Sequence, residues 1–307
     1  MCIRDRSFTI EKGQIYGFLG PNGAGKSTTM NIMTGYISAT SGEVLIDGHS
    51  ILDEPEKAKK SIGYLPEIPP LYLDMTVMEY LKFVAELKKI PKDKRSAEVR
   101  KASTLVKLND VSNRLIRNLS KGYKQRTGLA AAVLGFPDII ILDEPTVGLD
   151  PKQIIEIRQL IRKLAKDHTV ILSSHILAEV QEICDYVLII SKGKLVGSGT
   201  PEELEELSHG KDSIELTVKS DADTIQSVLD RIDGIQNVTW RNQGAGSCDL
   251  LVDTSKSAQE VCEDISIAFA TERIPVTRIN ILKATLEDIF LELTESSQKD
   301  EEGETKR

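Results

Sequence analysis

The chain has 307 residues, of which 40% are hydrophobic, 28% charged and 5% aromatic, and its formal net charge is −8. This length is enough for one large or two modest domains, each with its own core. The negative charge argues against a nucleic-acid footprint, and the low aromatic content argues against platforms on which bases stack.

Four cysteines, at positions 2, 184, 248 and 262, are widely spaced and form no CxxC pair. This spacing favours reduced thiols over a disulfide framework or a zinc site, and burial is the expected role of Cys184. The histidines show no ligand spacing, so no transition-metal site is expected. The sequence has no apolar run of 18 residues and no secretory signal, so we expect no membrane-spanning segment.

The chain opens with MCIRDR at Met1–Arg6, which fits neither an amphipathic strand nor a signal peptide. We expect a truncated or spliced-on start and exclude these residues from fold reasoning. Strands are predicted at Ser7–Ile10 and Ile15–Leu19, with a turn at Glu11–Gly13 between them. The second strand leads directly into GPNGAGKST at Gly20–Thr28, which a helical pattern follows.

This stretch has both the spacing G-x-x-x-x-G-K-[ST] and the strand–loop–helix context of a phosphate-binding loop. Glycines allow backbone N–H groups to approach phosphate oxygens closely, and the helix adds unpaired N–H groups and the positive end of its dipole. Lys26 is expected to reach the β- and γ-phosphates, and Ser27 to ligate Mg²⁺. The predicted nucleotide-binding residues here are Gly20, Pro21, Asn22, Gly23, Ala24, Gly25, Lys26, Ser27 and Thr28.

Further along, short strands are predicted at Glu43–Ile46 and Ile62–Leu65, and helices at Thr76–Ile90 and Lys92–Leu108. The two helices form a helical insert over about residues 74–118. The second half alternates helices and strands, which indicates a parallel α/β core. Its predicted elements are Ser120–Leu134, Ile139–Leu142, Pro151–Lys166, Thr169–Ser173, Ile176–Cys184 and Tyr186–Ile190, followed by a hairpin and a short helix to about Ser208.

Two carboxylates, Asp143 and Glu144, follow the apolar strand Ile139–Leu142. They lie at the carboxyl edge of the sheet, where open α/β sheets bind ligands. Beside a phosphate loop, Asp143 is expected to hold Mg²⁺ and Glu144 to accept a proton from an attacking water. The alternative is a pair of exposed acids that cap a strand.

Three further segments carry a family resemblance. LSKGYKQR at Leu119–Arg126 resembles the signature segment of ABC ATPases, ILDEPTVGLDP at Ile141–Pro151 resembles their Walker B motif and D-loop, and SSHIL at Ser173–Leu177 resembles their switch-histidine segment. With the phosphate loop, the resemblance covers residues 7–208. It implies a P-loop NTPase core with a helical insert, binding ATP and Mg²⁺.

The resemblance implies roles for four more residues. Ser120 and Gly122 would close on the γ-phosphate held by the partner's loop in a head-to-tail dimer, Asp150 would belong to the D-loop, and His175 would contact the γ-phosphate. Ser120 could instead be only a helix N-cap, and Asp150 with the following proline could be only a helix start. His175 could be a solvated loop residue.

The chain departs from the family at two places. Glu67, in YLPE, stands where the family usually has a glutamine that reaches Mg²⁺, and we expect it to act as a Mg²⁺ ligand with altered coupling. YLPE resembles a variant of exporter ATPases, including those associated with gliding motility. The aromatic residue that stacks on adenine in the family has no counterpart, so weaker ATP binding is expected.

Residues 212–295 are predicted to form a small α+β domain with the order β-α-β-β-α-β, which is the ferredoxin-like pattern. It resembles the accessory domain of exporter ATPases, and LEDIFLELT at Leu286–Thr294 resembles their ending, although it could be a plain amphipathic helix. Residues 296–307 are charged and aperiodic, which predicts a disordered tail.

The resemblance implies an ATP-hydrolysing subunit that closes as a homodimer, or with a paired ATPase subunit, and powers export by a separate membrane permease. The helical insert and the Glu67 loop would contact that permease, which places the chain in the cytoplasm at the inner face of the membrane. The alternatives are an ABC-type ATPase that acts on ribosomes or nucleic acid, a nucleotide-gated module with little hydrolysis, and an importer ATPase. A co-purifying membrane protein would separate the transporter ATPase from the ATPase that acts on ribosomes or nucleic acid and from the nucleotide-gated module.

Overall fold

The computed structural model describes residues 7–206, 213–244, 246–282 and 290. One compact unit runs to Pro201 and another begins at Glu202. Four predicted features fall in whole or in large part outside the described residues. They are the first six residues, the domain boundary at residues 208–212, the helix at Leu286–Thr294 and the tail 296–307.

The first unit is built on a six-stranded sheet with the order β4-β5-β6-β1-β7-β8. All neighbouring strands are parallel except β7 and β8, which form an antiparallel pair. The strands are β1 (Ile15–Leu19), β4 (Ile62–Leu65), β5 (Ile139–Leu142), β6 (Thr169–Ser174), β7 (Tyr186–Ser191) and β8 (Lys194–Gly199). Because β6 lies between β5 and β1, the segments that follow these three strands leave the sheet at one edge.

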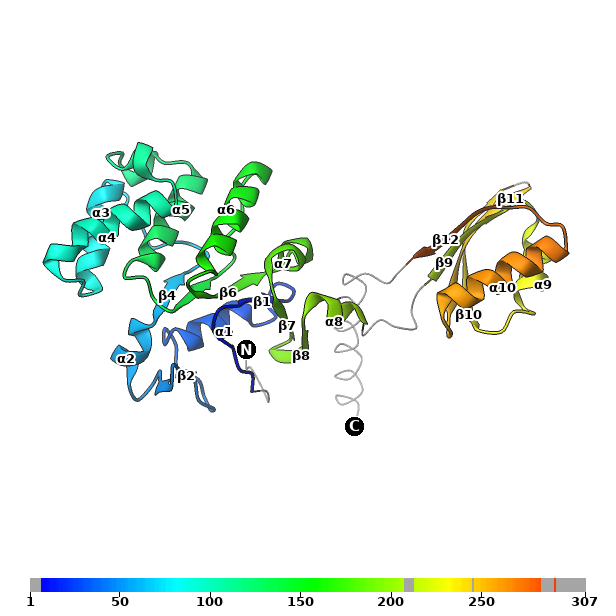
Figure 1. Ribbon diagram of the computed structural model, residues 1–307, viewed down its shortest axis with the longest axis horizontal. Helices are drawn as coiled ribbons and strands as arrows, with labels where there is room; N and C mark the ends of the chain where they lie inside the picture. Colours follow the sequence, from blue (N-terminus) through cyan, green and yellow to red (C-terminus); the bar gives the residue numbers. More distant parts are fainter. Residues whose placement is uncertain (1–6, 207–212, 245, 283–289, 291–307) are drawn as a thin grey trace. The chain divides into compact units, whose positions relative to one another are not determined.

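Helices surround this sheet (Figure 1). They are α1 (Lys26–Met33), α2 (Pro55–Lys60), α3 (Val77–Leu87), α4 (Lys92–Leu105), α5 (Lys121–Val133), α6 (Pro151–Leu164) and α7 (Leu177–Ile183). The short helix α8 (Pro201–Glu206) begins at the last residue of the first unit and continues into the second. A small hairpin of β2 (Leu45–Ile46) and β3 (His49–Ser50) stands apart from the main sheet. The alternation of strands and helices confirms the predicted α/β core.

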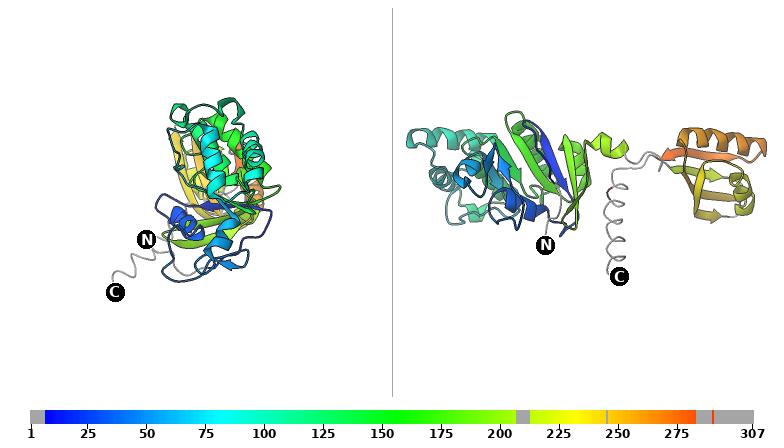
Figure 2. Two further views of the ribbon diagram at one scale, coloured as in Figure 1. Left: turned by 90° about the vertical axis from the view of Figure 1, so that its left-hand side faces the viewer. Right: turned by 90° about the horizontal axis from the view of Figure 1, so that it is seen from below.

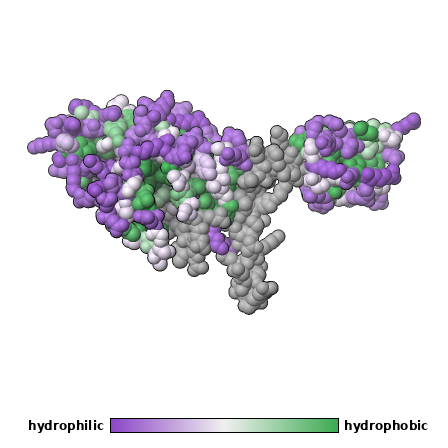
Figure 3. Space-filling view, turned by 60° about the horizontal axis from the view of Figure 1, so that its bottom comes forward, coloured by the Kyte–Doolittle hydropathy of each residue, from purple (hydrophilic) through white to green (hydrophobic). Residues whose placement is uncertain are grey.

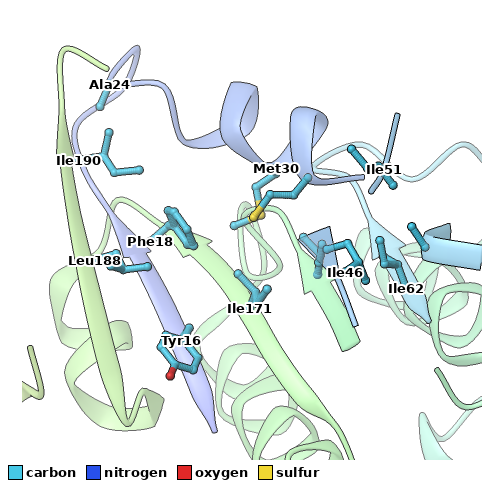
Figure 4. Close-up of a cluster of buried hydrophobic side chains, with 13 residues drawn as sticks. Tyr16, Phe18, Ala24, Met30, Ile46, Ile51, Ile62, Ile171, Leu188 and Ile190 are labelled. Atoms are coloured by element: carbon cyan, nitrogen blue, oxygen red, sulfur yellow. The ribbon is translucent and has the colours of Figure 1, made fainter. Parts of the chain in front are cut away.

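One face of the sheet packs against α1. Figure 4 shows Phe18, Leu188 and Ile171, from three neighbouring strands, together with Met30 of α1 in one apolar cluster. Phe18 and Met30 are fully buried. This packing fixes α1, and with it the phosphate loop that precedes it, on the edge of the sheet.

The helical insert consists of α3 and α4, which pack against each other and against α5 (Figure 1). Thr76 begins α3 with a capping box: its hydroxyl accepts from the Glu79 N–H, and the Glu79 carboxylate accepts from the Thr76 N–H. This reciprocal pairing satisfies two of the donors that a helix start leaves free. The structure therefore starts α3 one residue after the predicted first residue and ends it at Leu87.

The structure differs from the predicted elements near the start of the chain. Ser7–Ile10 is not a strand; the ring of Phe8 packs edge-on against Phe18, with centroids 5.4 Å apart, but the backbone has no partner strand among the described residues. The strand predicted at Glu43–Ile46 is only two residues long. The short helix α2, which starts at Pro55, was not predicted because its six residues give too short a periodic pattern.

The second unit is a four-stranded antiparallel sheet with the order β10-β11-β9-β12. Its elements are β9 (Ser213–Val218), α9 (Ala222–Leu229), β10 (Ile235–Gly244), β11 (Ser247–Thr254), α10 (Ala258–Thr271) and β12 (Val276–Leu282). This is the predicted ferredoxin-like arrangement. Figure 2 shows α10 (orange) running along β12 in this unit.

Alternate residues of β9 and β11 are buried under the two helices of this unit, so one face of the sheet makes its core. The other face is polar: Glu215 pairs with Arg241 at 3.0 Å and with Arg278 at 3.2 Å. These pairs join three strands on the open side of the sheet.

The visible surface of the first unit is largely hydrophilic, with hydrophobic patches between the charged side chains (Figure 3). Among the described residues, no helix has both the length and the apolar character needed to cross a membrane. Exposed apolar side chains include Ile68, Tyr72 and Leu73, which lie between β4 and α3.

Candidate functional site

The loop between β1 and α1 is held close to the sheet. Gly25 is the N-cap of α1 with φ 113°, a left-handed conformation that favours glycine. A Cβ atom at Gly20 would lie 2.3 Å from the carbonyl oxygen of Ile190, so only glycine fits between the loop and β7. These constraints turn the chain sharply and leave the first N–H groups of α1 at the loop.

Lys26 is the first residue of α1, and its side chain is 6% exposed. Its Nζ donates to the carbonyl oxygens of Gly20, at 2.7 Å, and Pro21, at 3.4 Å. The same nitrogen lies 3.5 Å from Oε1 of Glu144. The ammonium group therefore lies inside the loop and faces the end of β5.

Asp143 is 3% exposed and receives two hydroxyl groups on one oxygen. Ser27 Oγ donates to Asp143 Oδ1 at 3.2 Å, and Ser173 Oγ donates to the same atom at 2.6 Å. The Asp143 N–H donates to Leu65 O at 2.8 Å, which fixes the end of β5 against β4. Thus the carboxylate predicted to hold a metal contacts the hydroxyl predicted to share it.

Glu144 is 7% exposed and has φ 47°, in the left-handed region that non-glycine residues rarely adopt. This backbone conformation turns its side chain out of the strand. Oε1 then lies near Lys26, and Oε2 lies 2.9 Å from Nδ1 of His175, a residue that is 39% exposed. The carboxylate is therefore bracketed by two groups that can contact a phosphate.

A tyrosine on β4 borders the same cluster. Tyr64 donates its hydroxyl to Asn31 Oδ1 at 3.1 Å. Burial, together with the negative charge of Asp143, raises the pKa of Tyr64 to about 12. Its hydroxyl therefore stays protonated at neutral pH and acts as a donor.

The side chains at this edge fit Mg²⁺, which prefers oxygen ligands and usually takes only one or two carboxylates beside substrate phosphates. Ser27 Oγ and Asp143 provide such oxygens at one place. Within the described part of the chain, no group of three or more His, Cys, Asp or Glu residues could form a metal cage. This agrees with a site in which phosphate oxygens would complete the coordination.

Glu67 stands apart from this cluster. It is exposed and lies two residues beyond Leu65, and no hydrogen bond or ion pair joins it to the cluster in the described residues. The structure thus brings together Lys26, Ser27, Asp143, Glu144 and His175, but not Glu67.

Ser120, Gly122 and Asp150 form a second group. Ser120 is the N-cap of α5, with its Oγ 3.5 Å from the Tyr123 N–H, and Asp150 is the N-cap of α6, accepting from the Gln153 N–H at 2.9 Å. A Cβ atom at Gly122 would lie 2.7 Å from the Gln153 side chain. The starts of α5 and α6 are therefore in close contact.

Two buried polar residues were not predicted from the sequence. The Ser173 hydroxyl donates to the Asp143 carboxylate and accepts from the Glu144 N–H. Glu179 accepts from Thr146 Oγ1 at 2.6 Å and from Ser174 Oγ at 3.3 Å, which links the loop after Glu144 to the segment before His175. The sequence shows only a glutamate in a short helical pattern, and the fold is needed to show that Glu179 is buried and what it contacts.

Comparison with known proteins identifies the family. Residues 3–147 match the profile of the family described as "ABC transporter". The chain is 34% identical over 310 residues to the uncharacterized ABC transporter ATP-binding protein YhcH of Bacillus subtilis, covering 99% of this chain and 92% of that protein. The chain belongs to the ABC transporter ATP-binding proteins.

Other ABC proteins extend the comparison. The linearmycin resistance ATP-binding protein LnrL of Bacillus subtilis is 31% identical over 300 residues, with 97% of this chain and 95% of that protein covered. ABC transporter A family member 1 of Dictyostelium discoideum is 30% identical over 304 residues, which are 95% of this chain but only 34% of that longer protein.

Among solved structures, an ATP-binding cassette crystallised as a dimer in a post-hydrolysis state with ADP and Pi matches with a TM-score of 0.58 and 26% identity. The match covers 63% of this chain and 88% of that one. The fold of the first unit is therefore that of an ABC ATPase, and the chain is the ATP-binding subunit of an ABC transporter.

Proposed function

We propose that this subunit hydrolyses ATP with Mg²⁺ to power export by a separate membrane permease. The observation that supports hydrolysis most directly is the buried cluster in which Glu144 contacts both Lys26 and His175. A protein that only bound nucleotide with Mg²⁺ would need the carboxylate of Asp143 beside the phosphate loop, but not the second carboxylate of Glu144. A general base has to lie within hydrogen-bond reach of the water that it activates.

In this proposal each residue of the cluster has one task. Lys26 donates to the β- and γ-phosphate oxygens, and the loop Gly20–Thr28 surrounds them with backbone N–H groups. Glu144 accepts a proton from the attacking water, and His175 contacts the γ-phosphate. The contact between Glu144 Oε2 and His175 Nδ1 supports this assignment because it holds the two side chains beside each other.

Ser27 and Asp143 would hold Mg²⁺, whose chemistry when bound is to neutralise charge on the phosphate oxygens. Ser27 Oγ is already 3.2 Å from Asp143 Oδ1, so the two oxygens need little rearrangement to share one ion. Glu67 would join them only after its loop moves toward the cluster, since it is exposed and makes no contact with these residues.

We also propose that two copies close head to tail over two nucleotides. Ser120 and Gly122 of one copy would then face the phosphate loop of the other, with Asp150 at the same interface. The contact of Gly122 with Gln153 supports this, because it brings together the starts of α5 and α6, whose N-caps are Ser120 and Asp150. The dimeric state of the related cassette is in line with it.

For coupling, we propose that the helical insert and the Glu67 loop contact the permease at the inner face of the membrane. Ile68, Tyr72 and Leu73 support this because they are 83%, 55% and 49% exposed on the segment that joins β4 to the insert. Export rather than import is favoured by the similarity to a linearmycin resistance protein. Residues 212–295 would be an accessory domain of this exporter.

The test of hydrolysis is phosphate release from ATP by the purified chain, with and without Mg²⁺, compared with the variant Glu144→Gln. The proposal requires turnover that depends on both the metal and Glu144. Phosphate release by the variant at the wild-type rate would contradict it.

The test of coupling is co-purification of a membrane protein from detergent extracts with the tagged chain. We expect the variant Ile68→Asp to lose that partner but to retain ATP binding, because Ile68 does not contact the cluster. Retention of the partner by the variant would exclude this surface. A ribosome or nucleic acid in place of a membrane protein would support the alternative function.

A further inference from the structure

Ser173 is the residue of β6 that lies beside the end of β5, and its side chain is completely buried. Its hydroxyl makes two hydrogen bonds. It donates to Asp143 Oδ1 at 2.6 Å and accepts from the Glu144 N–H at 2.8 Å. One hydroxyl group thus joins the side chain of one carboxylate residue to the backbone of the next.

As an acceptor, the Ser173 hydroxyl provides a hydrogen-bond partner for the backbone N–H of Glu144. The Glu144 N–H donates to the Ser173 hydroxyl, and a buried N–H without a partner would cost free energy. The residue itself has φ 47°. A non-glycine residue in this conformation persists only where the surroundings hold it. Ser173 supplies that partner, so it stabilises the conformation that aims the Glu144 side chain at Lys26 and His175.

As a donor, the Ser173 hydroxyl fixes the direction of the Asp143 carboxylate. Ser27 and Ser173 both donate to Oδ1, from opposite neighbours: the helix α1 and the strand β6. With Oδ1 held by two hydroxyl groups, the plane of the carboxylate cannot turn freely. Residues that orient a metal ligand in this way govern metal affinity although they do not touch the metal.

We propose that Ser173 is a positioning residue that sets the Mg²⁺ affinity and the turnover of this site together. The proposal rests on the proposed function, because it assigns Asp143 to the metal and Glu144 to the water. It predicts that loss of the hydroxyl weakens metal binding and slows hydrolysis while nucleotide binding to the loop is retained. If Ser173 only stabilised the fold, its replacement would lower the stability of the chain without weakening metal binding more than nucleotide binding.

The experiment compares Ser173→Ala with the control Thr169→Val in the full chain. Thr169 lies at the other end of β6, is 4% exposed, and accepts from the Gly13 N–H at 3.0 Å. The control therefore also removes a buried hydroxyl that accepts a backbone N–H, but far from Asp143. The probe is Mn²⁺, whose binding is followed by electron paramagnetic resonance in the presence of a non-hydrolysable ATP analogue.

For Ser173→Ala we expect Mn²⁺ affinity and kcat each to fall by about 10–100-fold, the usual effect of losing a partner that orients a metal ligand. Binding of the analogue in EDTA should stay within about twofold of wild type, because Lys26 and the loop are untouched. The control should stay within about twofold in all three measurements. Unchanged Mn²⁺ affinity, or an equal loss in the control, would overturn the proposal.

Should the alanine variant fail to fold, Ser173→Cys serves as the second variant, since a thiol has nearly the same shape but is a weak donor and acceptor. The same loss is expected, and wild-type Mn²⁺ affinity would overturn the proposal. Failure of the proposed function has a different signature: the wild-type chain itself would then show no Mg²⁺-dependent turnover.

Discussion

The ammonium nitrogen of Lys26 lies 3.5 Å from Oε1 of Glu144, and the two side chains are 6% and 9% exposed. A buried pair of opposite charges is stable only because each partner offsets the desolvation of the other. A phosphate oxygen that binds Lys26 would therefore meet the negative charge of Glu144 beside the same ammonium nitrogen. In the proposed function the residue that primes the water thus also competes with the substrate for the lysine.

This relationship makes a prediction for Glu144→Gln. We expect phosphate release to fall by about 10²–10⁴-fold, the range for loss of a general base, while ATP binding is retained or tightened because the competing charge is gone. The variant should form a dimer only when ATP is present, as measured by size-exclusion chromatography. The exposed residue Glu43, changed to glutamine, is the matched control and should behave as wild type.

Lys26→Ala should weaken ATP binding by at least about tenfold, because a charge-assisted hydrogen bond to phosphate is lost. Isothermal titration with ATP measures this, and the control is Lys163→Ala on the exposed side of α6. The unpaired charge left on Glu144 also lowers stability, so binding is measured well below the unfolding temperature. Wild-type affinity in Lys26→Ala would refute the phosphate-loop assignment.

His175→Ala separates catalysis from folding. Its side chain is 39% exposed and accounts for one contact with Glu144, so little stability depends on it. We expect kcat to fall by about 10²-fold and the unfolding free energy to change by less than about 0.5 kcal/mol. Phosphate release and urea unfolding are the two measurements. A variant with normal kcat would leave His175 as a solvated loop residue.

Glu179→Ala tests the link between the loop after Glu144 and the segment before His175. The carboxylate is 3% exposed and accepts from Thr146 and Ser174. Its removal leaves the buried Thr146 hydroxyl without its acceptor and takes an ion-pair partner from Arg158, so we expect a loss of about 2–4 kcal/mol in the unfolding free energy. Combining Glu179→Ala with Thr146→Val in a double-mutant cycle should show strong coupling. A purely additive result would mean that the contact contributes no stability.

The thiols should react in order of their burial. Burial raises the pKa of Cys184 above its ordinary value, and it raises the pKa of the half-buried Cys262 as well. In a Cys2→Ser background, we expect an aromatic disulfide reagent to modify Cys262 first, and Cys184 and Cys248 only upon unfolding in urea. Fast labelling of Cys184 in the folded chain would contradict the burial of this residue at the end of α7.

The parts of the site that local sequence determines were predictable. The phosphate loop and the carboxylates after β5 follow from spacing alone, because each belongs to one strand and the turn that ends it. The ferredoxin-like order of the second unit also follows from its alternating pattern of apolar residues. Such features depend on neighbours along the chain.

Ser173 could not be found in this way. Its role exists because β6 lies beside β5, so that Ser173 reaches residues 30 and 29 positions away in the sequence. Nor does the sequence show that Glu144 leaves its strand with a positive φ. The strand expected at Ser7–Ile10 failed for the related reason that strand formation needs a partner, and none of the described residues pairs with it.

The close packing of Gly122 on the Gln153 side chain links the start of α5 to the start of α6. Gln153 also donates its backbone N–H to Asp150, so one residue of α6 contacts both Gly122 of α5 and the N-cap of its own helix. In the proposed dimer, Ser120 at the start of α5 and Asp150 at the start of α6 would therefore approach the partner copy, and move away from it, together. A methyl group at Gly122 would displace the Gln153 side chain, so in the proposed dimer Gly122→Ala would disturb the segment that faces the partner's phosphate loop.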